Sequence, residues 1–279
     1  MKITLPGSGP ILCFGGPYSN LQASEAMRAE AQRLDIPPDR VICTGDIVAY
    51  CANPNETVDL IRAWGCHVIK GNCEEQLAQR AGDCGCGFGE GTACDLLSNS
   101  WYAFADQTLR DDLRAWMEEL PATLTFDLAG RRARVIHGGV RENSRFIFAS
   151  TPAAEKASEL DEAAADFVIS GHCGIPFVQH VGKRIWFNPG VIGMPANDGT
   201  ADGWYGLIEG TPDYGGLRFS VRRLGYDAIG AAAALGLSGH ANGYAEALLS
   251  GLWPSLDVLP AKERAATGQR IAAEAFLLA

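Results

Sequence analysis

Four side chains able to bind a metal follow short apolar segments of the 279-residue chain. They are Asp46, Asn72, His137 and His172, and each has a glycine as a neighbour. Glycine lets the backbone turn sharply, so the adjacent side chains can point into one shared site. One carboxylate, one amide oxygen and two imidazoles suit a divalent ion such as Mn²⁺, Fe²⁺ or Zn²⁺. We therefore predict that these four residues hold a metal ion.

The elements that must position these residues alternate between short apolar strands and amphipathic helices. Strands are expected at Ile11–Phe14, Val41–Cys43 and His67–Ile69. Helices are expected over Asn20–Leu34 and from Asn53 onward, where Asn53 can cap the helix and a proline fits its first position. This alternation predicts parallel strands joined by right-handed crossovers. Ligands of such sheets bind beyond the carboxyl ends of the strands, where the predicted metal residues lie.

The rest of the chain mixes strands and helices less regularly. A helix is expected over Asp106–Leu120, and a hairpin is expected around Ala129-Gly130. A further helix runs from Thr151 to about Ala164, and the region after Tyr226 is rich in Ala and Leu and is expected to be helical. The remaining strands are expected at Phe167–Ser170, Phe177–Val181, Arg184–Phe187, Trp204–Glu209 and Leu217–Leu224. We predict one α/β domain over residues 1–224, with a helical C-terminal extension at 225–279 packed on it.

Five short motifs connect the sequence with a known family. They are Gly45-Asp46, Gly71-Asn72, His137-Gly138, Gly171-His172 and Asn188-Pro189-Gly190. In this order and spacing they resemble the calcineurin-like metallophosphoesterase family, and the resemblance covers roughly residues 11–209. The loop over residues 45–50 is similar to that of small bacterial phosphodiesterases and diadenosine-tetraphosphatase-like proteins. The resemblance implies a two-sheet β-sandwich flanked by helices, and a pair of metal ions that clamps a phosphoryl group.

The sequence departs from the family pattern at one of the two metals. Gly16 replaces the Asp of the first motif, Tyr18 replaces its His, and Gly174 replaces the second His of the last motif. In the family these three side chains serve only the first metal, whereas the four residues predicted as ligands here serve the second. Random loss of ligand residues would usually remove ligands of both metals, whereas here only ligands of the first metal are missing. We therefore expect one divalent metal ion and no organic cofactor. Two alternatives are a vestigial site without metal and a second site rebuilt from other residues.

Four further residues are candidates for catalysis and substrate binding. Cys73 stands where many members of the family carry a His that assists at the leaving-group oxygen; the alternative is a small buried residue. Tyr18 can donate a hydrogen bond to a phosphoryl oxygen. The alternative is that its ring only fills the volume left by the missing ligands of the first metal. Asn20 and Arg141 are predicted to bind substrate, because Arg suits bidentate phosphate contact; the alternative for Arg141 is a solvated loop residue.

The cysteines form a second unusual feature of the sequence. The chain has nine of them and no evident secretory signal, so we expect reduced thiols or ligands in the cytoplasm and not a disulfide framework. Cys84, Cys86 and Cys94 crowd a glycine-rich segment, residues 83–94, close to the Asn72 motif. The segment can be a small metal-binding loop, a redox pair or a lid over the site.

Composition excludes several classes of function. The formal net charge is −10, with 23 Lys and Arg against 33 Asp and Glu, which argues against a nucleic-acid polymer as partner. The sequence contains no apolar run near the roughly 20 residues that span a bilayer. We therefore predict a metal-dependent phosphoesterase for a small phosphorylated or nucleotide-like compound. The alternatives are an inactive module that binds a phosphorylated ligand and, less directly indicated, chemistry at one redox-active iron.

Overall fold

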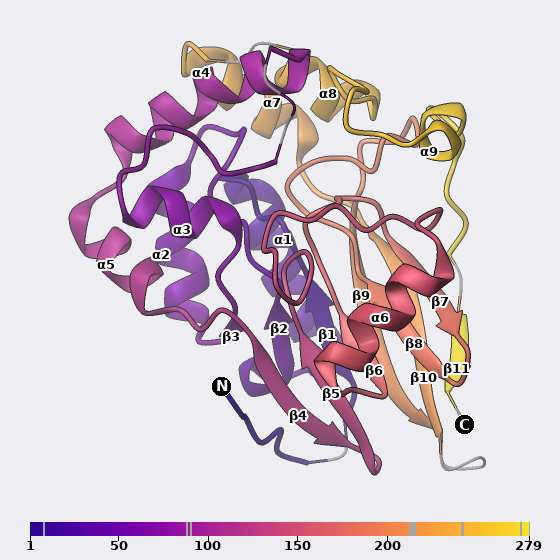
Figure 1. Ribbon diagram of the computed structural model, residues 1–279. Coiled ribbons are helices and arrows are strands. Elements are labelled where there is room, and N and C mark those ends of the chain that lie inside the picture. The colour runs from indigo at the N-terminus through magenta and orange to yellow at the C-terminus, as the bar shows by residue number, and fades with distance from the viewer. Residues whose placement is uncertain are drawn as a thin grey trace.

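The computed structural model describes residues 1–7, 9–87, 89, 91–211, 216–240, 243–273 and 275–278. Two β-sheets face each other across a shared core, and helices cover their outer surfaces (Figure 1). The predicted α/β fold with two mixed sheets flanked by helices is therefore confirmed.

The first sheet has six strands among the described residues. In spatial order they are β11 (Ala275–Leu278), β10 (Gly216–Leu224), β9 (Gly203–Thr211), β1 (Ile11–Phe14), β2 (Val41–Cys43) and β3 (His67–Val68). Strands β1, β2 and β3 are parallel, as the sequence predicts, and β9, β10 and β11 run antiparallel to their neighbours. Strands β1 and β2 are buried on both faces, which explains why they read as continuous apolar runs.

The second sheet has five described strands. In spatial order they are β4 (Leu124–Leu128), β5 (Arg131–Val135), β6 (Phe167–Ile169), β8 (Arg184–Asn188) and β7 (Phe177–Val181). Strands β4 and β5 form the predicted hairpin. Its two turn residues, Ala129 and Gly130, have φ angles of 48° and 72°, the left-handed pair that a tight two-residue hairpin requires.

The two sheets meet through aromatic side chains. The ring of Phe219 on β10 lies 5.1 Å from that of Phe167 and 5.5 Å from that of Phe187, both on the opposite sheet. Gly206 on β9 faces the same cluster, and a Cβ atom there would lie 2.2 Å from Cζ of Phe187. The glycine therefore sets how closely the sheets approach at this point.

Helices fill the outer layers and the end of the sandwich that holds the strand-end loops. Helices α1 and α2 pack on the six-stranded sheet and α6 packs on the five-stranded sheet (Figure 1). None of the described helices is both long and apolar enough to cross a membrane. The helices are α1 (Leu21–Arg33), α2 (Pro54–Trp64), α3 (Asn72–Ala78), α4 (Ala93–Thr108), α5 (Asp111–Glu119), α6 (Ala153–Ala163), α7 (Ala228–Leu237), α8 (Tyr244–Ser250), α9 (Ala261–Ala265) and the 3₁₀ helix η1 (Pro38–Arg40).

Three local predictions differ from the structure. The helix expected over Asp106–Leu120 is interrupted, because α4 ends at Thr108 and α5 begins at Asp111. The side chain of Asn55 on α2 stabilises this break, since it donates to the carbonyl of Thr108 and accepts from the backbone N–H of Arg110. Asn53 precedes α2 without a side-chain cap, although the proline occupies the first helical position as expected. The C-terminal region also contributes a strand, β11, which pairs with β10.

Candidate metal centre

Four strand-end side chains converge on one point. The Nε2 atom of His137 lies 3.2 Å from Oδ2 of Asp46. The same nitrogen lies 3.1 Å from Oδ1 of Asn72 and 3.1 Å from Nδ1 of His172. All four residues are buried. The structure thus brings together every residue that the sequence analysis proposed as a metal ligand.

Hydrogen bonds outside the cluster orient its members. Nδ1 of His137 lies 2.6 Å from the carbonyl oxygen of Thr44, so it donates there and Nε2 faces the cluster. The amide nitrogen of Asn72 donates to the carbonyl of Cys84 at 2.9 Å, which turns Oδ1 inward. In a tetrahedral site with metal–ligand distances of about 2.0–2.1 Å, neighbouring ligand atoms lie about 3.3–3.4 Å apart. The three spacings from Nε2 of His137 are close to this value, and the ligand atoms of Asp46 and His172 lie within 4.8 Å of each other, so the donor set can hold a single divalent ion.

The electrostatics of the cluster favour a cation. Burial and the adjacent imidazole of His137 lower the pKa of His172 to about 3, so its Nδ1 lone pair is available at neutral pH. Burial opposes ionisation of Asp46, but the charge and hydrogen bond of His137 outweigh it and hold the pKa of Asp46 below its usual value. Burial also opposes a charge on His137, yet Asp46 raises the pKa of His137. An ionised carboxylate beside a neutral imidazole at His172 provides lone pairs that a metal ion can accept.

A buried carboxylate that the sequence analysis overlooked holds the Asp46 loop. Oε2 of Glu74 accepts backbone N–H bonds from Gly71 and Asp46, both at 2.8 Å, and Oε1 accepts from Ile47 at 2.7 Å. Burial and the charge of Asp46 raise the pKa of Glu74 to about 7. A Glu three residues after a helix cap is one half of a capping-box signal, and this part was visible in the local sequence; the bonds to Asp46 and Ile47, 28 and 27 residues away, were not. Glu74 is therefore a positioning residue for the ligand Asp46.

The backbone around the ligands is unusual. Asp46 has a φ of 58° and His172 a φ of 61°, in the left-handed region that non-glycine residues rarely adopt. Gly71 lies against the first of these loops, and a Cβ atom there would lie 2.3 Å from Oδ1 of Asp46. Strained positions of this kind cluster at functional sites, where the surrounding structure holds them.

Comparison with known proteins assigns this arrangement to a family. A model of the calcineurin-like phosphoesterase superfamily domain matches residues 19–213, a span that contains all four candidate ligands. The chain belongs to this superfamily. An uncharacterized protein of Methanocaldococcus jannaschii is 24% identical over 226 residues, which are 75% of this chain and 85% of that protein.

Solved structures of similar fold support the assignment of the architecture. A metallophosphoesterase from Sphaerobacter thermophilus superposes with a TM-score of 0.67 at 22% identity, covering 88% of this chain and 100% of that one. A hypothetical protein from Pyrococcus horikoshii OT3 superposes with a TM-score of 0.71 at 15% identity, covering 89% of this chain and 99% of that one. At these identities the likeness establishes the fold.

Aromatic side chains occupy the places where the calcineurin-like pattern has ligands for a first metal. A Cβ atom on Gly16 would lie 2.6 Å from atoms of the Tyr18 ring. A Cβ atom on Gly174 would lie 3.3 Å from the Trp253 ring, which comes from the C-terminal region. Both glycines also have positive φ angles, of 47° and 74°. A side chain at Gly16 would require both the Tyr18 ring and Val191, also 2.6 Å away, to move, whereas one at Gly174 would require the Trp253 ring to shift by a few tenths of an ångström.

The predicted catalytic candidate Cys73 lies behind the cluster. Its thiol is hydrogen-bonded to the Asp46 carboxylate, and its backbone N–H donates to Oδ1 of Asp46 at 3.3 Å. Burial and the charge of Asp46 raise the pKa of the Cys73 thiol well above its usual value, so the thiol stays protonated. In this structure Cys73 supports the orientation of Asp46.

The two predicted substrate-binding residues have other contacts. Asn20 caps α1, with Oδ1 accepting from the N–H of Ala23 at 3.0 Å, and its amide nitrogen donates to the carbonyl of Gly193 at 3.0 Å. Arg141 is exposed and forms an ion pair with Glu162 on α6. The geometry therefore gives Asn20 a helix-capping role and leaves Arg141 on the surface, because neither lines the pocket beside the metal cluster.

The cysteine-rich segment lies over the ligand Asn72. Cys84 and Cys86 form a disulfide, which corrects the expectation of free thiols for this pair, whereas Cys94 lies on α4 as a free thiol. Sγ of Cys86 lies 3.4 Å from the amide nitrogen of Asn72. Residues 88 and 90 of the predicted segment lie outside the described residues. The pairing is consistent with the redox pair, and the presence of Cys86 and Cys94 in the lining of the pocket beside Asp46 and His172 is consistent with the lid.

Proposed function

We propose that the protein is a metal-dependent phosphoesterase that hydrolyses a small phosphorylated compound at a single-metal site. The observation that carries the proposal is the convergence of Asp46, Asn72, His137 and His172 within a buried cluster that opens into a pocket. The aromatic rings at Gly16 and Gly174 support one metal over two. The excess of acidic residues and the seven free cysteines are consistent with a small substrate and a reducing compartment such as the cytoplasm.

The residues of the chain have distinct tasks in this proposal. A bound Mn²⁺, Fe²⁺ or Zn²⁺ would supply Lewis-acid stabilisation of phosphoryl charge. His137 is held by the Thr44 carbonyl, and the loop that carries Asp46 is held by Glu74. Tyr18 lines the same pocket, and burial and the charge of Asp46 raise its pKa, so its phenol stays protonated and can donate to a phosphoryl oxygen.

A second candidate is a module that binds a phosphorylated ligand without hydrolysing it. The filled first-metal positions favour this alternative, because a single ion lacks the two-metal clamp that stabilises both attacking and leaving oxygens. The test uses metal-loaded protein. Binding of phosphate without hydrolysis of phosphomonoesters, phosphodiesters or dinucleoside polyphosphates would favour the binding module.

Metal analysis tests the proposed site directly. Protein purified without chelator is expected to contain about one ion per chain, and His172→Ala is expected to lose it, because a ligand is removed. The control is His180→Ala, an exposed imidazole on β7. Two ions per chain would contradict the single-metal site, and an ion retained in His172→Ala would contradict the ligand set.

A further inference from the structure

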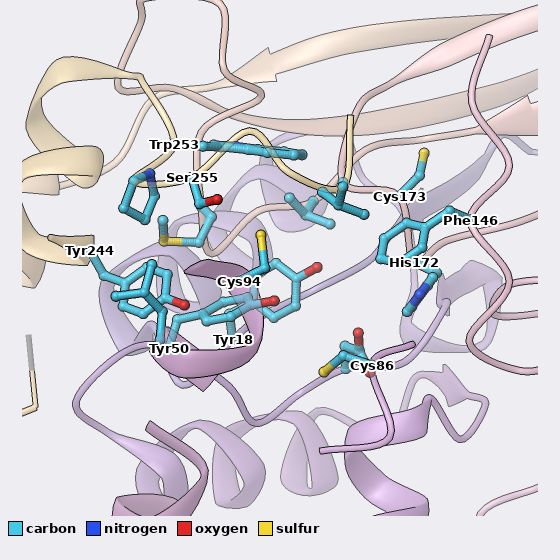
Figure 2. Close-up of a pocket in the computed structure, with 17 residues that line it drawn as sticks. Tyr18, Tyr50, Cys86, Cys94, Phe146, His172, Cys173, Tyr244, Trp253 and Ser255 are labelled. Atoms are coloured by element: carbon cyan, nitrogen blue, oxygen red, sulfur yellow. The ribbon is translucent and has the colours of Figure 1, made fainter. Parts of the chain in front are cut away.

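A pocket extends from the metal cluster toward the C-terminal region. It begins at Asp46 and His172 and encloses about 720 Å³, counting the space at its open mouth. Trp253 lies along one side, and Tyr18, Tyr50 and Tyr244 gather on the other (Figure 2). The pocket therefore adjoins the position at which the first metal of the family would bind.

The lining of the pocket is almost entirely apolar. Apart from the ligands Asp46 and His172, the described residues that line it are aromatic, aliphatic, sulfur-containing, or a glycine, a proline and a serine. No Lys or Arg is among these described lining residues, so further phosphate groups of a substrate would lack a cationic partner here. A group that enters the pocket must be uncharged to avoid a large desolvation penalty.

The aromatic walls are held in place before any ligand enters. The indole N–H of Trp253 donates to the carbonyl of Pro195 at 2.7 Å, which fixes the plane of the ring. The Tyr50 ring packs edge-on against Tyr18 and Trp101, with centroid distances of 4.8 and 5.2 Å. Fixed aromatic faces bind flat apolar groups at a small entropic cost, and ring stacking adds to the burial of apolar area.

We propose that this pocket binds the flat, apolar alcohol portion of the substrate, so that the enzyme acts on aryl phosphoesters. The proposal rests on the proposed phosphoesterase function and names its substrate class. The aryl group would lie between Trp253 and the tyrosines, with its phosphoryl group at the metal cluster. Burial of an apolar group would then supply binding energy beside the position at which the first metal of the family would bind.

Two substrates with leaving groups of similar acidity test the pocket. With Mn²⁺ bound, we expect kcat/KM for 2-naphthyl phosphate to exceed that for phenyl phosphate about tenfold, because the second ring adds buried apolar area. Trp253→Ala is expected to reduce this ratio to about threefold or less, through loss of the stacking face. The control, Trp116→Ala, removes a half-buried indole of α5 outside the pocket and is expected to keep the ratio.

A second variant tests the pocket independently, in case Trp253→Ala does not fold. Val258→Phe fills the pocket from its half-exposed wall, and the matched Leu256→Phe alters the same segment outside the lining. We expect Val258→Phe to lower the naphthyl-to-phenyl ratio at least threefold and Leu256→Phe to retain it. A ratio near one in the wild-type protein, or an unchanged ratio in Val258→Phe, would overturn the aryl pocket.

Binding of the product alcohol, measured without catalysis, tests the aryl pocket independently of the proposed phosphoesterase function. Titration of metal-free protein with 2-naphthol, followed by the fluorescence of the probe, is expected to saturate and to weaken about tenfold in Trp253→Ala. Saturation without hydrolysis of any phosphoester would leave the pocket supported and contradict the enzyme. Hydrolysis without 2-naphthol binding up to millimolar concentration would leave the enzyme supported and contradict the pocket.

Discussion

Replacement of Glu74 by Gln tests the support of the metal loop most directly. The wild-type carboxylate accepts three backbone N–H bonds, two at Oε2 and one at Oε1, and the side chain is completely buried. An amide has only one accepting oxygen. In its better orientation, Glu74→Gln keeps the bonds to Gly71 and Asp46 and places an NH₂ group against the N–H of Ile47.

The magnitude follows from the bond that is lost. Above about pH 8, where Glu74 is ionised, removal of a charge-assisted hydrogen bond costs about 1.5–3 kcal/mol, and a buried N–H without an acceptor costs about 1–3 kcal/mol more. The free energy of unfolding should therefore fall by about 2.5–6 kcal/mol, which lowers Tm by about 5–24 °C in a protein of this size. Since the backbone of Asp46 loses part of its support, the affinity for the metal should fall about 10- to 100-fold.

Urea unfolding and metal titration of the purified protein give the two readouts. The control is Glu75→Gln, the same substitution at the next residue, whose side chain is half-exposed. It should change the free energy of unfolding by less than about 0.5 kcal/mol. If Glu74→Gln also stays within that range and binds metal normally, the three hydrogen bonds do not support the loop and the reasoning is refuted.

Two further substitutions test the body of the fold. Gly206→Ala should lower the free energy of unfolding by about 1–3 kcal/mol, because the new Cβ meets Phe187, whereas Gly210→Ala on the same strand faces open space and should be nearly neutral in urea unfolding. Burial opposes ionisation of Asp198, but hydrogen bonds from a neighbouring threonine and from Arg223 (2.6 Å) lower its pKa. Its contribution is therefore present above its unfolded pKa and is lost as pH falls below about 4. Asp198→Asn should reduce the loss of stability measured by urea unfolding across that acid range; an unchanged pH dependence would contradict the pairing.

Much of the site was predictable because its determinants are local. Strands β1 and β2 are short runs of apolar residues, and glycines mark the turns that follow them. Within each sheet the parallel strands place their carboxyl ends at one edge, so Asp46 and Asn72 form one neighbouring pair, after β2 and β3, and His137 and His172 form another, after β5 and β6. The residue types of these strand ends predicted a metal cluster, whereas the meeting of the two pairs depends on how the two sheets pack. Only the bond of Glu74 to the N–H of Gly71 is local; its bonds to Asp46 and Ile47 span 28 and 27 residues.

The features that escaped prediction depend on long-range contacts. Trp253 enters the pocket from a segment about 80 residues beyond Gly174, and no local pattern indicates where that ring lies. The break between α4 and α5 is stabilised by Asn55 of α2, over 50 residues earlier in the chain. Strand β11 is only four residues long, and its pairing with β10 determines its conformation more than its composition does.

The pairing of β1 with β9 has a consequence for folding during synthesis. Ile11 pairs with Ile208, so β1 waits during synthesis for a partner strand roughly 200 residues behind it. At typical rates of translation this delay is roughly 10–40 s, during which an apolar strand has one unpaired edge in the nascent chain. Tyr244 and Trp253, which line opposite sides of the pocket, are synthesised later still. We expect the pocket to assemble only after residues 244–258 have left the ribosome, and a chaperone that shields the earlier part of the chain should raise the yield of folded protein.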